Sequence, residues 1–280
     1  MLLLDIREYK RAIPMVQAAD INTLFALSVL EGRVRGRVFT DQQAEPASFY
    51  IQHPYGMALL CGESTNEGFY AKLTTHLLNL DDARDQAEWL QVYPASLYSR
   101  IEAILGPNLI KKKPNEQYDV SQDEDRRVLE YQRINFVFNQ EKYLSFKSSL
   151  PRDDHKIVAT SEVMFDEING SVVPRHFWNN AGDFIRNGIG FTVLKNDVPI
   201  STAYSSFIIG DRLEIGIETS VDHRGAGLAS VVCAELIDYC LTKGYKPVWA
   251  CGSGNMGSRK LAHRLGFEEA KRIPYYRLPQ

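Results

Sequence analysis

One stretch, residues 213–230, constrains the fold of this 280-residue chain more than any other. Its sequence, LEIGIETSVDHRGAGLAS, starts with the alternating side chains of a β-strand and ends in small residues that begin a helix. Between the two lies a turn of Gly225, Ala226 and Gly227. The first N–H groups of a helix lack intrahelical acceptors and carry partial positive charge, so the turn predicts a binding site for phosphate.

Two common phosphate-binding motifs do not fit this turn. No lysine follows the glycines as a P-loop requires, and Ala229 and Ser230 stand at the later positions of a dinucleotide-binding turn. What remains is the pattern R-x-x-G-x-A, formed by Arg224, Gly227 and Ala229. Because a glycine-rich turn is often only a tight connection, a second segment is needed to interpret it.

That second segment has the pattern N-x-x-S-x-x-x-A-x-x-L-G-F and begins at Asn255. Before it, apolar residues at helical spacing predict a helix that ends at Gly244, and residues 247–251 predict a buried strand. Together, the glycine turn and the later segment resemble the two cofactor-binding segments of the GNAT acyltransferase superfamily, whose ligand is acetyl-coenzyme A.

This resemblance implies a mixed α/β fold, of the α+β kind with a mixed sheet, and a complete acyl-CoA N-acyltransferase domain in the C-terminal half. It implies acetyl-CoA as cosubstrate; the scattered histidines, which lack ligand spacing, separately argue against a metal site. The positions that it assigns to the cofactor are Ile217, Glu218, Thr219, Arg224, Gly225, Ala226, Gly227, Leu228, Ala229, Asn255 and Ser258.

A narrower similarity lies in the sequences V-V-P-x-x-F-W, at residues 172–178, and I-E-T-S, before the glycine turn. These resemble the two-domain GNAT branch that includes the zwittermicin-resistance acetyltransferase. Members of that branch are two-domain proteins, and their known activity is the acetylation of an amine on a small antibiotic; the resemblance leaves the acceptor of this chain open.

Two domains are expected, because the chain is long for one globular unit. We place them at residues 1–150 and 151–280, with the boundary at 148–154, where hydrophobic periodicity is lost and a proline occurs. The first half repeats the order strand, strand, strand, helix, strand, helix that follows residue 188, which predicts tandem GNAT-like domains. Its turn at residues 62–68, GESTNEG, carries two carboxylates that would repel a pyrophosphate. The first domain is therefore predicted to be degenerate and to leave coenzyme A to the second.

Some segments give weaker signals. Residues 128–138 predict a strand, with residues 143–146 as a candidate partner strand, and residues 107–127 predict a long loop. Three aromatic residues, Phe177, Trp178 and Phe184, are candidates to line an acceptor pocket. Their helical spacing favours the plainer interpretation that they pack in the core.

Acetyl transfer from a thioester to an amine needs a base for the ammonium proton, a group that stabilises the oxyanion, and a proton for the thiolate. Glu214 and Glu218 share one face of the predicted strand. Glu214 ranks above Glu218 as the base, since Glu218 is nearer the phosphate turn; a structural role is the alternative for each. The resemblance assigns the thiolate's proton to a tyrosine after L-G-F, for which Tyr275 and Tyr276 are the candidates.

Composition and charge limit the functional classes. With 24% charged residues and a net charge of -3, the chain has no general affinity for nucleic acid. The first apolar run ends at Asp5, so neither a signal peptide nor a membrane span is expected. The six histidines lack ligand spacing, and no C-x-x-C occurs among the four cysteines, which suggests core cysteines in a reducing compartment and a cytoplasmic protein.

The sequence thus predicts an acetyl-CoA-dependent N-acetyltransferase that moves an acetyl group directly to a primary amine of a small molecule, as a monomer or homodimer. Two alternatives remain open. A tandem GNAT aminoacyl or peptidoglycan-type transferase would not need the glycine turn, and a non-catalytic acyl-CoA-sensing module would keep the turn without an acceptor site.

Overall fold

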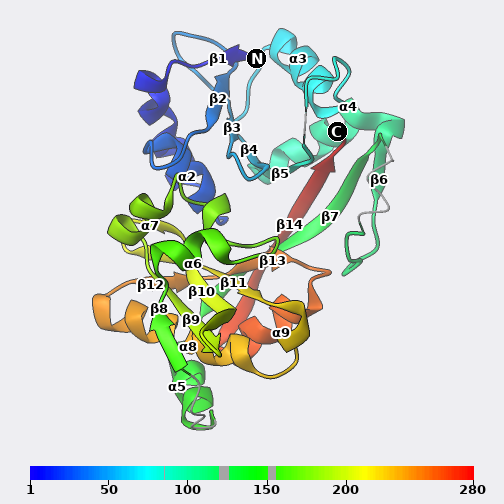
Figure 1. Ribbon diagram of the computed structural model, residues 1–280. Coiled ribbons are helices and arrows are strands. Elements are labelled where there is room, and N and C mark those ends of the chain that lie inside the picture. Colours follow the sequence, from blue (N-terminus) through cyan, green and yellow to red (C-terminus); the bar gives the residue numbers. More distant parts are fainter. Residues whose placement is uncertain (85, 120–125, 151–155) are drawn as a thin grey trace. The chain divides into compact units, whose positions relative to one another are not determined.

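The computed structural model describes residues 1–84, 86–119, 126–150 and 156–280 (Figure 1). The chain divides into two compact units. The first unit comprises Met1–Ile134, Cys251–Met256 and Lys271–Gln280, and the second comprises Asn135–Ala250 and Gly257–Ala270. Segments near the C-terminus therefore complete the first unit. Most of the boundary expected at residues 148–154 lies outside the described residues.

The first unit begins with short helical pieces and continues into strands that alternate with helices. The helical elements are η1 (Ile6–Ala12), α1 (Ile13–Gln17), α2 (Leu24–Leu30), α3 (Glu67–Leu77), η2 (Ala95–Leu97), α4 (Tyr98–Leu105) and η3 (Gly106–Asn108). The strands are β1 (Leu2–Leu3), β2 (Arg37–Thr40), β3 (Phe49–Gln52), β4 (Met57–Cys61), β5 (Glu88–Tyr93) and β6 (Leu109–Lys111). The order strand, strand, strand, helix, strand, helix predicted for this half is confirmed by β2 to α4.

These strands belong to a sheet with the order β1-β2-β3-β4-β5-β14-β7-β13, in which β6 also pairs with β7. Its later members are β7 (Val128–Phe138), β13 (Ala250–Gly252) and β14 (Phe267–Leu278). Neighbours from β2 to β4 are antiparallel, whereas β4 and β5 are parallel because α3 connects them. Side chains of α3, including Phe69 and Leu73, bury against Leu60 and Val92 and form the core of this unit.

The second unit repeats this plan on a separate sheet with the order β12-β11-β10-β9-β8. The strands are β8 (Lys156–Ala159), β9 (Gly190–Lys195), β10 (Val198–Ile209), β11 (Arg212–Thr219) and β12 (Lys246–Val248). The helical elements are α5 (Gln140–Ser148), α6 (Glu162–Glu167), η5 (Pro174–His176), α7 (Ala181–Asn187), η6 (Val221–His223), α8 (Leu228–Lys243) and α9 (Met256–Arg264). As predicted, α8 ends at Gly244, which adopts a left-handed conformation with φ of 78°.

Three local predictions were wrong. Residues 143–146 belong to helix α5, because Asn139 caps its first turn by accepting a hydrogen bond from the Lys142 N–H at 3.1 Å. The predicted loop at 107–127 contains β6, which pairs in parallel with β7; residues 120–125 lie outside the described part. The predicted strand at 247–251 is divided at Trp249 into β12 and β13, which join different sheets.

The three aromatic candidates for an acceptor pocket are buried, which confirms the interpretation as core. Phe177, Trp178 and Phe184 all fall among the buried residues of the second unit. The indole N–H of Trp178 donates to the backbone oxygen of Ser205 at 2.7 Å. A buried indole needs such a partner, so Trp178 is a packing residue that ties the helical segment before β9 to β10.

Candidate active site

Strand β11 is longer than the strand that pairs with it on one side. Its parallel ladder with β12 joins Arg212 to Lys246, Leu213 to Pro247 and Glu214 to Val248. Its antiparallel ladder with β10 continues to Thr219. After Val248 the chain leaves β11, and the oxygen of Trp249 accepts from the N–H of Phe136 in β7 at 3.1 Å. The two parallel strands therefore separate after Glu214.

Backbone groups of β11 face the space where β12 has ended. The N–H of Ser220 donates to Ile200 of the β10 side at 2.9 Å. Because hydrogen bonding alternates along an antiparallel strand, Ile217 and Thr219 direct their N–H and C=O groups away from β10. The guanidinium of Arg224 reaches one of them, since its Nε donates to the Thr219 oxygen at 3.1 Å.

The glycine turn between β11 and α8 is exposed and open. Gly225 and Gly227 have φ of +82° and +83°, a region that favours glycine, and a Cβ built on either would meet nothing within 4 Å. Gly227 is the N-cap of α8 and accepts from the N–H of Ser230 at 2.9 Å. The preceding N–H groups, of Leu228 and Ala229, have no intrahelical acceptor by position. The turn thus presents backbone N–H groups and the positive end of a sixteen-residue helix.

Glu218 holds the start of this turn to the loop after α6. Its Oε2 accepts from the N–H groups of Ser171 at 3.0 Å and Val172 at 3.2 Å, and its Oε1 accepts from Arg224 Nη2 at 3.1 Å. A Cβ on Gly170 would lie 2.4 Å from Oε2, so only glycine permits this approach. The side chain is 9% exposed and is engaged with three donors, an arrangement that suits a structural anchor.

Glu214, the favoured base, lies where the strand pair opens. It is 6% exposed and stands opposite Phe207, next to a register shift in β10. Two residues further along the same face, Gly216 packs against Tyr204 so closely that a Cβ would lie 2.5 Å from its ring Cζ. The shared face predicted for Glu214 and Glu218 is therefore interrupted by a tyrosine ring that covers Gly216.

Both tyrosine candidates lie in the part of β14 that belongs to the first unit. Tyr276 is fully buried in the core of that unit, and burial raises its pKa well above the usual range. Tyr275 is 8% exposed and stacks on Trp89 with ring centroids 4.8 Å apart. Arg133 lies over the ring of Tyr275 at 5.2 Å from its centroid. Tyr276 therefore fits packing, and Tyr275 lies in a second hydrophobic cluster with Leu129 and Tyr131, where Arg133 is its charged neighbour.

Asn255 and Ser258, the two candidates of the later motif, belong to different units. Asn255 is exposed at the start of α9, and its N–H donates to Gly252 at 3.0 Å; this segment belongs to the first unit. Ser258 belongs to the second unit, and its Oγ accepts from the indole of Trp249 at 3.1 Å. Ser258 thus fixes the residue at which β12 and β13 diverge.

Three residues that the sequence does not single out also contribute to the site. Gly170, Ser171 and Val172 contact the Glu218 side chain from a loop more than forty residues earlier in the chain. The only hint in the sequence is the glycine at position 170, because a close approach by a side chain from another strand leaves no local pattern.

The corresponding turn of the first unit is built differently. Strands β4 and β5 pair along the whole of β4, from Met57 to Cys61, and the Gly62 N–H continues the contact by donating to Tyr93 at 2.9 Å. A Cβ on Gly62 would lie 2.2 Å from the oxygen of Ala47, so the turn packs tightly against a neighbouring loop. These strands stay together where β11 and β12 part.

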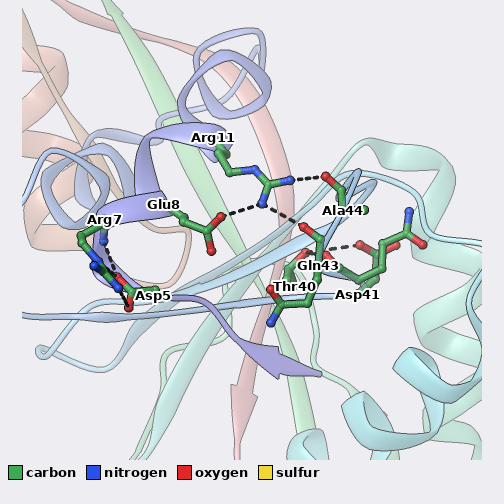
Figure 2. Close-up of polar contacts among 9 residues, drawn as sticks. Asp5, Arg7, Glu8, Arg11, Thr40, Asp41, Gln43 and Ala44 are labelled. Carbon is green, nitrogen blue, oxygen red and sulfur yellow. Dashed lines mark hydrogen bonds and ion pairs between the residues drawn. The ribbon is translucent and has the colours of Figure 1, made fainter.

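Side chains fill this first turn. Asp41 accepts from Ser64 Oγ at 2.5 Å and from the N–H of Ala47 at 3.1 Å, and Asn66 caps α3 by accepting from Phe69. Figure 2 shows how Arg11 holds the loop that carries Asp41, by donating to the backbone oxygens of Gln43 and Ala44. A turn occupied by its own carboxylates and hydroxyls is a poor site for a diphosphate.

Among the residues that the structure describes, no group of three or more histidine, cysteine, aspartate or glutamate side chains is arranged to hold a metal ion. In the same described part, every helix is too short or too polar to cross a bilayer.

Comparisons with known proteins agree with this geometry. A family model described as GNAT acetyltransferase matches residues 16–276. The uncharacterized N-acetyltransferase YdfB of Bacillus subtilis (strain 168) is 26% identical over 254 residues, which cover 90% of this chain and 89% of that protein.

Solved structures share the fold over nearly the whole chain. A GCN5-related N-acetyltransferase-like protein from Streptococcus suis 89/1591 has a TM-score of 0.69 at 20% identity and covers 98% of this chain and 100% of its own. A tandem GNAT protein from the clavulanic acid biosynthesis pathway has a TM-score of 0.59 at 11% identity, with 99% of this chain and 97% of its own covered. The prediction of a tandem arrangement is therefore confirmed at the level of fold.

Proposed function

The chain belongs to the GNAT acetyltransferase family and is an acyltransferase; on this premise we propose that it transfers an acetyl group from acetyl-CoA to a primary amine of a small molecule. The observation that carries the proposal is the divergence of β12 from β11, directly before an open glycine turn. The finer resemblance, to the branch that includes the zwittermicin-resistance acetyltransferase, supports an antibiotic or another aminated metabolite as acceptor.

The second unit offers two complementary kinds of contact to an extended nucleotide thioester. The turn at residues 224–229 presents N–H groups and a helix N-terminus, which suit the diphosphate. The N–H and C=O groups of Ile217 and the N–H of Thr219 point to the side of β11 that β12 has left, which suits the amides of a pantetheine arm in the manner of an added strand. Arg224, held by Glu218 and Thr219, adds a positive charge beside the turn.

When bound, acetyl-CoA supplies the activated acetyl thioester. The protein must then remove a proton from the acceptor, because an alkylammonium with a pKa of about 10 is mostly charged at neutral pH. We assign this proton transfer to Glu214, directly or through water, since Glu218 is already engaged with three donors. A backbone N–H at the opening of β11 is suited to the oxyanion. From the resemblance, the thiolate's proton stays assigned to Tyr275, because Tyr276 is fully buried in the core of the first unit.

We place the reaction in the cytoplasm, because all four cysteines are buried thiols, which is typical of a reducing compartment. Burial raises the pKa of Cys61 and of Cys240 to about 12, so these thiols are inert packing residues. None of them is needed as a nucleophile, which agrees with direct transfer to the amine.

The proposal is tested with purified protein, acetyl-CoA and a panel of small amines. We expect calorimetric binding of acetyl-CoA and release of free thiol that depends on the amine. Glu214→Gln should lower kcat about 100-fold with little change in the affinity for acetyl-CoA. Glu218→Gln, in contrast, should weaken the affinity for acetyl-CoA.

Other outcomes would favour the alternatives. No binding of acetyl-CoA would favour a tandem aminoacyl or peptidoglycan-type transferase. Binding without thiol release from any amine would favour an acyl-CoA-sensing module. Equal kcat values for the wild type and Glu214→Gln would remove Glu214 as the base.

A further inference from the structure

The first unit contains a cavity of about 620 Å³ that the acetyltransfer proposal does not use. Residues of β2, the end of β3, α3 and the start of β5 line it, together with the turn after β3 and the loop before β5; among them are Arg37, Gln52, Lys72, His76, Arg84 and Glu88. The volume is within the usual range for sites of small ligands. All described residues that line the cavity belong to the first unit.

A buried carboxylate forms the polar floor of this cavity. Glu88 is 6% exposed, and its carboxylate accepts from Tyr50 Oη and from Gln52 Nε2, the latter at 2.5 Å. His76 Nε2 lies 3.2 Å from the same carboxylate. Burial alone would raise the pKa of Glu88, but hydrogen bonds from His76 and Tyr50 outweigh it and lower that pKa. The floor is therefore a connected network of polar side chains.

The rim of the cavity carries an excess of positive charge. Among the described residues that line it, Arg35, Arg37, Lys72 and Arg84 are cationic, and Asp81 and Glu88 are anionic. His53 adds no charge at neutral pH, because burial lowers its pKa to about 3. Within the described part of the chain, Arg35, Arg37 and Lys72 form no ion pair, so their charges are available to a ligand.

The walls of the cavity are held in place. Arg84 donates from its two terminal nitrogens to the backbone oxygens of Pro279, at 2.5 Å, and His76. Gly36 approaches Gln52 so closely that a Cβ would lie 2.4 Å from its backbone oxygen. A site whose walls are fixed before binding costs less ordering free energy when a ligand enters.

The cavity is separate from the degenerate turn of the same unit. It is bordered by Gly56, directly before β4, and by Glu88, the first residue of β5. The turn at residues 62–68 follows Cys61, at the other end of β4. The cavity is therefore not a remnant of a cofactor site that the first unit lost.

We propose that this cavity binds a small organic anion, a phosphate monoester or a carboxylate, whose charged group meets Arg37 and Lys72 and whose hydroxyl groups meet the floor around Glu88. Cationic side chains and a polar floor suit a hydroxylated anion better than an apolar or cationic ligand. The proposal rests on no part of the acetyltransfer proposal, because it concerns only residues of the first unit.

The test is calorimetry at low ionic strength with glucose 6-phosphate, citrate and, as the uncharged control, glucose. We expect one or both anions to bind with a Kd below about 1 mM, and glucose not to bind measurably. The stronger of the two anions identifies the charged group. Hydrogen exchange of the wild type with the stronger anion should show protection in residues 35–39 and 72–84.

Charge variants then locate the site. The double variant Arg37→Gln, Lys72→Gln should raise the Kd of the anion about tenfold, because two charge-assisted contacts are lost. The matched control removes two exposed lysines of the same unit outside the cavity, Lys10→Gln with Lys113→Gln, and should leave the Kd unchanged. The four single variants are measured in the same way, and circular dichroism verifies that every variant is folded.

A phosphate could also enter the glycine turn of the second unit, so Ala226→Glu serves as a second control. Anion binding that survives Ala226→Glu and weakens in the Arg37 and Lys72 variants supports the proposal. Binding lost with Ala226→Glu, an equal Kd in both double variants, or no binding of either anion at about 10 mM would overturn it.

Discussion

The two units contain the same sequence of strand, turn and helix, but the strands behave differently. In the first unit, β4 pairs with β5 along its whole length, and Gly62 extends the contact to Tyr93. In the second unit, β12 leaves β11 after Glu214 while β11 continues to Thr219. One parallel pair is closed at the end where the turn begins, and the other is open.

The turns that follow β4 and β11 also differ, since the first is filled by side chains and the second is open. Residues 62–68 are filled by contacts with Asp41 and by the cap that Asn66 provides for α3. Gly225 and Gly227 have open space where a side chain would lie. A common fold therefore leaves the two units unequal as binding sites, and the opening of the strand pair, rather than the order of elements, distinguishes them.

A charge in the open turn should have the largest effect. We expect Ala226→Glu to lower the affinity for acetyl-CoA about 100-fold or more, because the new carboxylate would lie among the N–H groups that suit the diphosphate. Ala226 lies outside the left-handed region, so the substitution adds no backbone strain, unlike one at Gly227. Calorimetry measures the affinity, with Ala226→Gln as the neutral control; equal losses in both variants would contradict an electrostatic cause.

Removal of the anchor of the open turn should have the next largest effect. Glu218→Ala leaves the N–H groups of Ser171 and Val172 without their acceptor and releases Arg224. We expect a loss of about 2 kcal/mol in the free energy of unfolding, measured by urea denaturation. Glu218→Gln, which keeps an acceptor oxygen, should lose about half as much. Full stability of the alanine variant would show that the anchor is dispensable.

Substitution of the strand glycine should be milder. In Gly216→Ala the new Cβ would lie 2.5 Å from Cζ of Tyr204, so the ring or the strand must shift. We expect a loss of about 1 kcal/mol in stability from this overpacking, measured by the same denaturation. A Gly216→Ala, Tyr204→Phe double variant should remain destabilised, because the ring carbon persists. No change in the single variant would mean that the face beside Glu214 adapts freely.

Neutralising the closed turn should have the smallest effect. Glu63→Gln with Glu67→Gln removes both carboxylates from residues 62–68. If repulsion alone kept coenzyme A away, this variant would gain a second site for acetyl-CoA. We expect the calorimetric stoichiometry to stay at that of the wild type, because β4 and β5 remain paired. A gained site would show that charge, not the opening of the strands, separates the two units.

Much of the fold could be predicted from the sequence because the signals were local. The strand at residues 128–138 has its predicted bounds, and α8 ends at the predicted glycine, since hydrophobic period and caps mark these elements. The segment 143–146 was mistaken for a strand, because its few apolar residues have no clear period and the cap from Asn139 decides the conformation.

The candidate site could be predicted only in part. The glycines at 225 and 227 identified the turn, because their positive φ is a property of the residue itself. The anchoring of Glu218 by residues 170–172 and the divergence of strands at Trp249 depend on segments distant in the sequence. No single-sequence pattern records such contacts, so these features required the structure.

Hydrogen exchange with and without acetyl-CoA tests the central claim most directly. We predict that the cosubstrate protects amides of residues 213–231, and that residues 57–70 exchange at the same rate in both states. Protection of residues 57–70 instead, or of neither segment under saturating acetyl-CoA, would contradict the claim that the open strand pair is the cosubstrate site.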